Sequence, residues 1–158
     1  VGFRLIGFKA EAIYYGSAEQ CQILGSYKNG YKTFFRNCLF KDMNYGGTYN
    51  KYFNCTFHNS GYYPIWNSEA IGCIVWAMGN NNNLGSQVSH SCLEKQQAGE
   101  GNFIADPKFV NAGNGDFHLQ ADSPCANVAL GSRIGKHFYD SDHAPGYLGA
   151  QSLQDALS

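Results

Sequence analysis

The chain carries little charge and no surplus of either sign. Of its 158 residues, 11 are Lys or Arg and 12 are Asp or Glu, so the formal net charge is −1. A protein that binds nucleic acid through its phosphates carries a basic surplus, and the composition therefore argues against that class of partner. No apolar run approaches the roughly 18 residues of a membrane-spanning helix, so we predict no membrane span.

Sequence motifs of several catalytic and cofactor sites are also missing. There is no G-x-S-x-G turn that would expose a serine nucleophile, and there is neither a Walker A loop nor a G-x-G-x-x-G turn for a nucleotide. The C-x-x-C and H-x-x-x-H pairs that hold zinc are absent too. The sequence thus predicts no nucleotide cofactor and no zinc site.

Helical periodicity is nearly absent as well, and the chain has instead a repeat marked by cysteine. Cys21, Cys38, Cys55 and Cys73 are separated by 17, 17 and 18 residues. Two positions after each of them comes an apolar residue, namely Ile23, Phe40, Phe57 and Val75. Because strand side chains alternate with period two, each Cys shares a face with the apolar residue that follows it. One short strand cannot bury that face, but stacked copies of it can.

The repeat predicts an all-β fold, a parallel β-helix of about 17–18 residues per coil. Residues 1–79 form its coils, and residues 80–158 form the last coil, loops and an irregular C-terminal cap of the same domain. The four repeat cysteines are expected to be free, buried thiols. Their side chains would stack in parallel about 4.8 Å apart, and a disulfide between them would need distortion.

Several segments add a family resemblance. These are 72–76 (GCIVW), 88–92 (VSHSC), 99–110 (GEGNFIADPKFV), 115–120 (GDFHLQ) and 123–125 (SPC). Together they resemble the C-terminal part of secreted bacterial right-handed parallel β-helix repeat proteins of the pectate-lyase-like superfamily. The resemblance implies a right-handed helix, a secreted or cell-surface location of bacterial type, and a disulfide between Cys92 and Cys125.

The N-terminal end of such a helix raises a further expectation. An uncovered first coil exposes unpaired backbone edges, and solenoids normally carry terminal caps. We therefore expect either upstream coils of a longer protein or a stacking partner at this end.

A candidate catalytic group lies on the repeat. Lys41 and His58 each come three positions after a repeat Cys, so stacking would make them neighbours on one exposed face, with Asp42 beside them. A titratable pair within reach of one sugar is what acid–base chemistry on a polysaccharide requires, so the group would suit a lyase or a glycoside hydrolase. The alternative is that the three side chains are ordinary solvated surface residues.

Tyrosine gives the candidate binding residues. Tyr45 and Tyr62 share one repeat position and Tyr27 lies one register away, with Tyr49 and Tyr63 close by in the sequence. An exposed row of these rings could stack against sugars, since tyrosine has an apolar body and a polar tip. The alternative is that the rings pack only on one another along the solenoid.

Metal binding has one weak candidate, the pair Asp140 and Asp142, whose carboxylates could hold calcium. The alternative is a solvated loop. Taken together, the sequence predicts an extracellular module that engages polysaccharide, as a C-terminal fragment of a larger carbohydrate-active or carbohydrate-binding protein. The alternative is a non-catalytic structural or adhesive module of a surface protein or tail fibre.

Overall fold

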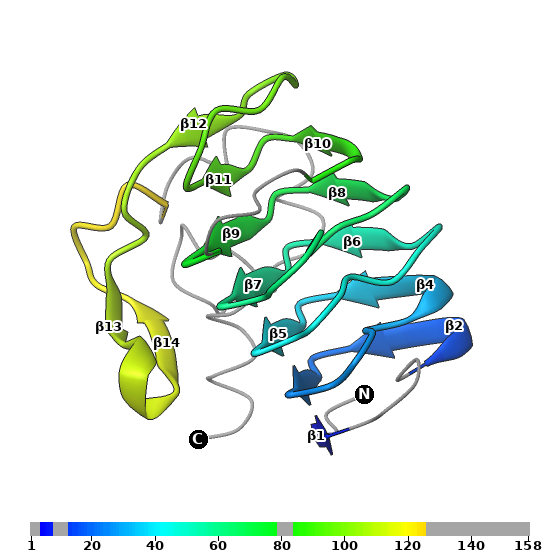
Figure 1. Cartoon of the computed structure of the whole chain (residues 1–158). Coiled ribbons are helices and arrows are strands. Elements are labelled where there is room, and N and C mark those ends of the chain that lie inside the picture. Colours follow the sequence, from blue (N-terminus) through cyan, green and yellow to red (C-terminus); the bar gives the residue numbers. More distant parts are fainter. Residues whose placement is uncertain (1–3, 8–12, 79–83, 126–158) are drawn as a thin grey trace.

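Two parallel sheets and a third side made of turns wind around one core, and the computed structural model describes residues 4–7, 13–78 and 84–125 of this arrangement (Figure 1). This is the predicted parallel β-solenoid, while its right-handed sense stays a prediction. No helix in the described residues is long and apolar enough to cross a membrane.

The first sheet has seven strands in the order β1-β3-β5-β7-β9-β11-β12. They are β1 (Arg4–Ile6), β3 (Gln22–Leu24), β5 (Leu39–Lys41), β7 (Thr56–His58), β9 (Ile74–Trp76), β11 (Cys92–Leu93) and β12 (Phe103–Ile104). Ile23 pairs with Phe40, Phe40 with Phe57, and Phe57 with Val75, which confirms the register that the cysteine repeat predicts.

The second sheet has five parallel strands in the order β10-β8-β6-β4-β2. They are β2 (Tyr14–Glu19), β4 (Tyr31–Arg36), β6 (Lys51–Phe53), β8 (Glu69–Ile71) and β10 (Gln87–Ser89). The remaining side, which we call the bridge side, is joined only by isolated parallel bridges, among them Tyr45 with Tyr62 and Thr48 with Trp66.

Each coil turns at corners where the backbone is left-handed. One corner is formed by Asn37 (φ 53°) and Asn54 (φ 52°), and Gly72 (φ 63°) takes the same place in the next coil. Asn and Gly are the residues that adopt this conformation most readily. The corner residues therefore divide the repeat into short strands and set the direction of each side.

The core is a column of stacked rings and thiols. Phe40 stacks on Phe57 with ring centroids 4.7 Å apart, and Phe35 stacks on Tyr52 at 5.3 Å. The four repeat cysteines are free and buried, as predicted. Each ring thus packs against the coil above or below it, so that burial links successive coils.

A polar network is also buried inside the second-sheet corner. The hydroxyl of Tyr52 donates to Asn29 Oδ1 over 2.8 Å and accepts from Asn50 Nδ2 over 2.8 Å. Asn50 Oδ1 in turn accepts from the backbone N–H of Thr33 over 2.8 Å. Burial raises the pKa of Tyr52 far above its usual range, so the phenol stays protonated and donates.

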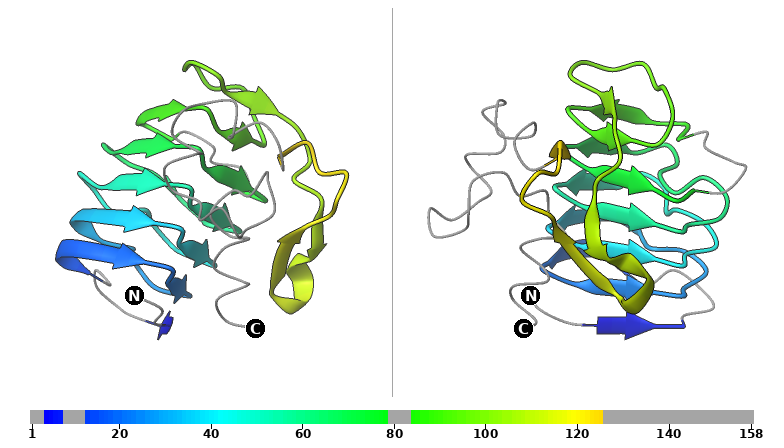
Figure 2. Two further views of the ribbon diagram at one scale, coloured as in Figure 1. Left: turned by 180° about the vertical axis from the view of Figure 1, so that it is seen from behind. Right: turned by 90° about the vertical axis from the view of Figure 1, so that its left-hand side faces the viewer.

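An antiparallel hairpin follows the coils. Its strands β13 (Phe109–Asn111) and β14 (Asp116–Leu119) are joined by a 3₁₀ turn, η1 (Ala112–Asn114). Figures 1 and 2 show the hairpin beside the first sheet and not over the last coil. The outward side chain of Leu39 on that sheet is apolar, and Phe117 packs against it, so the hairpin buries this face.

Candidate functional site

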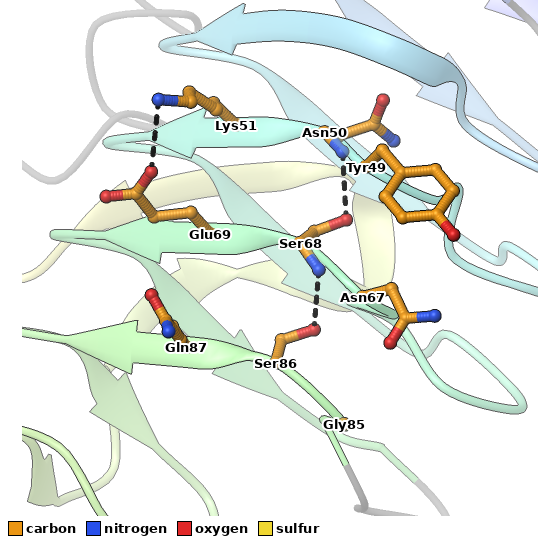
Figure 3. Close-up of a pocket in the computed structure, with 9 residues that line it drawn as sticks. All are labelled: Tyr49, Asn50, Lys51, Asn67, Ser68, Glu69, Gly85, Ser86 and Gln87. Carbon is orange, nitrogen blue, oxygen red and sulfur yellow. Dashed lines mark hydrogen bonds and ion pairs between the residues drawn. The ribbon is translucent and has the colours of Figure 1, made fainter.

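The outer face of the second sheet carries a shallow groove of about 690 Å³ (Figure 3). Three successive coils line it with three consecutive residues each, 49–51, 67–69 and 85–87. The spacing of 18 residues places equivalent positions one above another, so the groove consists of three rows that run along the solenoid.

The middle row forms the floor of the groove. The backbone N–H of Asn50 donates to Ser68 Oγ over 3.0 Å, and that of Ser68 donates to Ser86 Oγ over 3.2 Å. The two hydroxyls donate in turn to backbone carbonyls of the previous side, over 2.7 Å to Trp66 and 2.9 Å to Ile65. These hydrogen bonds hold the floor in one geometry, because both serine hydroxyls are committed to the backbone.

The second row stands at the start of the strands. Lys51 pairs in register with Glu69, and Glu69 pairs with Gln87. Lys51 Nζ lies 3.4 Å from Glu69 Oε2, with 62% and 39% of the two side chains exposed. An ion pair this exposed adds only about 0–1 kcal/mol to stability, so both heads remain available for contacts with a ligand.

The third row stands at the corner and begins with Tyr49, whose side chain is 58% exposed. Asn67 comes next, and Gly85 ends the row at φ 53°. A Cβ on Gly85 would lie 2.5 Å from the Trp66 ring. Trp66 therefore covers the backbone at this end of the groove, and Tyr63 packs on it with centroids 4.4 Å apart.

Replacing Gly85 by Ala is expected to lower the free energy of unfolding by about 1–3 kcal/mol, because Ala is strained at positive φ and collides with Trp66. Gly25→Ala is the matched control, since Gly25 has φ 60° but nothing within 4 Å of the added methyl. Urea unfolding should give a larger loss for Gly85→Ala. Equal losses would contradict the close contact with Trp66.

The predicted tyrosines fall into two places. Tyr49 is in the groove and Tyr63 lies at its Trp66 end. Tyr27, Tyr45 and Tyr62 form a separate ladder on the bridge side, with centroids 5.3 Å and 5.6 Å apart along the row. The ladder rings contact one another, and those of Tyr27 and Tyr62 are also exposed.

Most of the groove escaped sequence reasoning, although a signal for its corner was present. Tyr49 and Asn67 each come six positions before a repeat Cys. These positions do not repeat a residue type, so the repeat does not attract attention to them. Counting back from each Cys would have placed both at one corner.

The predicted catalytic residues do come together on the first sheet. Lys41 pairs in register with His58, and Lys41 Nζ lies 3.2 Å from Asp42 Oδ2. Their face is not open, however, as was expected. The His58 ring packs edge-on against Phe117 at 5.0 Å and against Phe109 at 6.1 Å, so the hairpin half-buries it.

This burial predicts a pH effect on stability. Burial lowers the pKa of His58 below 6.5, and the charge of Lys41 lowers it further, although Asp42 and Glu94 act in the opposite direction. The unfolded chain therefore binds a proton at a higher pH than the folded chain, so stability is full above about pH 6.5 and falls as the pH drops towards the folded-state pKa.

His58→Gln removes this titration. The stability difference between the wild type and the variant, measured by urea unfolding from about pH 7.5 to about pH 5, should shift against the wild type as the pH falls. A difference that stays constant over this range would contradict the burial of the ring.

The Cys92–Cys125 disulfide that the resemblance implied is not formed. Both cysteines are free and buried in one cluster. Cys92 Sγ donates to the carbonyl oxygen of Ala105 over 3.2 Å, so its thiol is directed to the backbone. A hydrogen bond with Cys92, together with burial, raises the pKa of Cys125 and keeps it a thiol.

Metal binding finds no support in the part of the chain that the structure describes. No group of three or more His, Cys, Asp or Glu side chains there could hold a metal ion. Asp140 and Asp142, the calcium candidates, lie outside the described residues.

Comparison with protein-family models, with curated proteins and with solved structures gave no significant match. The parallel β-solenoid is therefore established from the structure itself, and membership of the pectate-lyase-like superfamily stays a prediction.

Proposed function

We propose that this protein is an extracellular β-solenoid module that binds polysaccharide in the groove of the second sheet. The observation that carries the proposal is the combination of an exposed ring, Tyr49, with two rows of polar side chains in one open groove. The extracellular location and the type of ligand follow the sequence resemblance.

The chemistry of the groove suits a sugar chain. The face of the Tyr49 ring offers an apolar surface on which a sugar ring can stack, and its hydroxyl stays in water. The side-chain amides of Asn67 and Gln87 each combine a donor with an acceptor, and neither has a hydrogen-bond partner among the described residues. Each amide can therefore bridge two hydroxyls of one sugar.

The groove favours binding over cleavage. Most glycoside hydrolases use a pair of carboxylic acids on either side of the scissile bond. Among the nine residues that line the groove, Glu69 is the one carboxylate, and it is paired with Lys51. Catalysis by Lys41, Asp42 and His58 would instead have to occur beneath the hairpin on another face.

Affinity electrophoresis against a panel of neutral and acidic polysaccharides tests the proposal. Tyr49→Ala should weaken retention by about tenfold, a loss of about 1.4 kcal/mol. Tyr62→Ala, which removes a ring of similar exposure (50%) from the bridge-side ladder, should leave retention unchanged.

Three other outcomes would overturn the proposal. Loss of retention in Tyr62→Ala alone would move the site to the bridge-side ladder. Release of new sugar ends that depends on His58 would make the protein an enzyme of the first sheet. Absence of retention on every polysaccharide would favour the structural or adhesive alternative.

A further inference from the structure

The groove is electrically balanced, and this bears on which polysaccharide it takes. Its fixed charges are one cation, Lys51, and one anion, Glu69, whose heads lie 3.4 Å apart. The remaining lining side chains are amides, hydroxyls and one phenol. Resting on the proposed function, we infer that the groove selects a neutral polysaccharide and discriminates against uronate or sulfated chains.

The surroundings do not supply the missing positive charge. On the same sheet face Arg36 is ion-paired with Glu19. Along the groove corner the one cation is Lys32, whose ammonium lies over the rings of Tyr15 and Tyr31 at 5.5 Å and 5.4 Å. A site that concentrates an anionic polymer needs a surplus of one sign to produce an attractive field, and this face has none.

Glu69 acts directly against an anionic ligand. A carboxylate on the ligand would approach Lys51 only by also approaching Glu69, and like charges at such distances repel by about 1–4 kcal/mol depending on solvent exposure. Lys51 would have to leave Glu69 to bind the ligand. A neutral sugar hydroxyl avoids both costs.

The hydrogen-bonding groups of the groove point the same way. Asn67, Gln87 and Glu69 present side-chain oxygens that can only accept hydrogen bonds. Sugar hydroxyls can donate to them, whereas ionised carboxylates and sulfates have no proton to donate. The row of acceptors is therefore matched to hydroxyl groups.

The groove is also long enough for a chain. Lys51, Glu69 and Gln87 follow one another at about one strand spacing, about 4.8 Å each, so this row alone runs along the solenoid for about 10 Å. A second hollow of about 450 Å³ continues it and shares Glu69, Ser86 and Gln87. The ligand that fits this shape is a polymer lying along the solenoid axis.

The test compares binding of neutral polymers (xylan, mixed-linkage glucan, galactomannan) with that of polygalacturonate and a sulfated galactan at low salt. We expect the wild type to bind at least one neutral polymer and to bind the two anionic polymers at least about tenfold more weakly, equivalent to about 1.4 kcal/mol. Glu69→Gln should keep neutral binding within about threefold and should strengthen binding of the anionic polymers, because it leaves Lys51 unpaired.

Lys51→Gln is the matched control, since it leaves Glu69 unpaired and should weaken anionic binding further. Anionic binding as strong as neutral binding, and dependent on Tyr49, would overturn the inference while the proposed function stands. No change in the ratio of anionic to neutral binding in Glu69→Gln would also overturn it. Absence of binding to all polymers would overturn the proposed function and the inference with it.

Discussion

Replacing Phe57 by Ala is expected to lower the free energy of unfolding by about 3–5 kcal/mol, the range observed when a buried phenylalanine is truncated. The Phe57 side chain is 0% exposed. It stacks on Phe40 at 4.7 Å and meets Tyr52 edge-on at 5.0 Å. Because the coils above and below hold these rings in register, the cavity cannot collapse easily. Urea unfolding followed by circular dichroism measures the loss.

Phe34→Ala is the matched control for this prediction. Phe34 also stacks on an aromatic ring, that of Phe53 at 5.1 Å, but it lies on the outer face of the second sheet and is 37% exposed. Its loss should be about 1 kcal/mol or less, since it gives up little buried area. Similar losses for the two variants would mean that Phe57 is not at the centre of the core.

Replacing Asn50 by Leu is expected to cost about 2–4 kcal/mol, because it leaves buried polar groups without partners. The backbone N–H of Thr33 would lose Asn50 Oδ1, its acceptor at 2.8 Å. The hydroxyl of Tyr52 and the carbonyl oxygen of Gly30 would each lose a hydrogen bond from Nδ2. The same unfolding measurement applies.

Tyr52→Phe separates this effect from loss of packing. It removes one hydroxyl from the network but keeps the ring, and Asn29 Oδ1 still accepts from the backbone N–H of Gly47. Its expected loss is about 1 kcal/mol, the net value of a typical hydrogen bond. A smaller loss for Asn50→Leu than for Tyr52→Phe would contradict the central place of Asn50 in the network.

The repeat of the solenoid was predictable because it depends on local spacing. Cysteines 17–18 residues apart, each with an apolar residue two positions later, specify both the strand and its register. The pairing of Phe40 with Phe57 follows directly from them. A column of core residues repeats its chemistry in every coil, so a single sequence contains several copies of the signal.

The hairpin over the first sheet was not predictable in the same way. Phe109 and Phe117 lie some fifty residues after His58 in the chain, and no repeat position links them. Their packing depends on the outward apolar side chain of Leu39, which the repeat pattern alone does not distinguish from a solvated one. Contacts of this kind are specified by the tertiary structure.

The groove was missed for a related reason. Its rows mix residue types, as in Lys51, Glu69 and Gln87, because surface positions do not have to conserve one chemistry from coil to coil. The hairpin and the groove lie on different faces of the solenoid. With the first sheet covered, the second sheet is the open side on which a polymer can lie.

The most direct test of a glycan-binding groove is an NMR titration of the isotope-labelled chain with neutral xylan, glucan and mannan oligosaccharides. We predict that amide shifts change at residues 49–51, 67–69 and 85–87, and that they do not change at Tyr27, Tyr45 or Tyr62. Shift changes confined to the bridge-side ladder or to the surroundings of His58, or no changes with any oligosaccharide, would contradict the account.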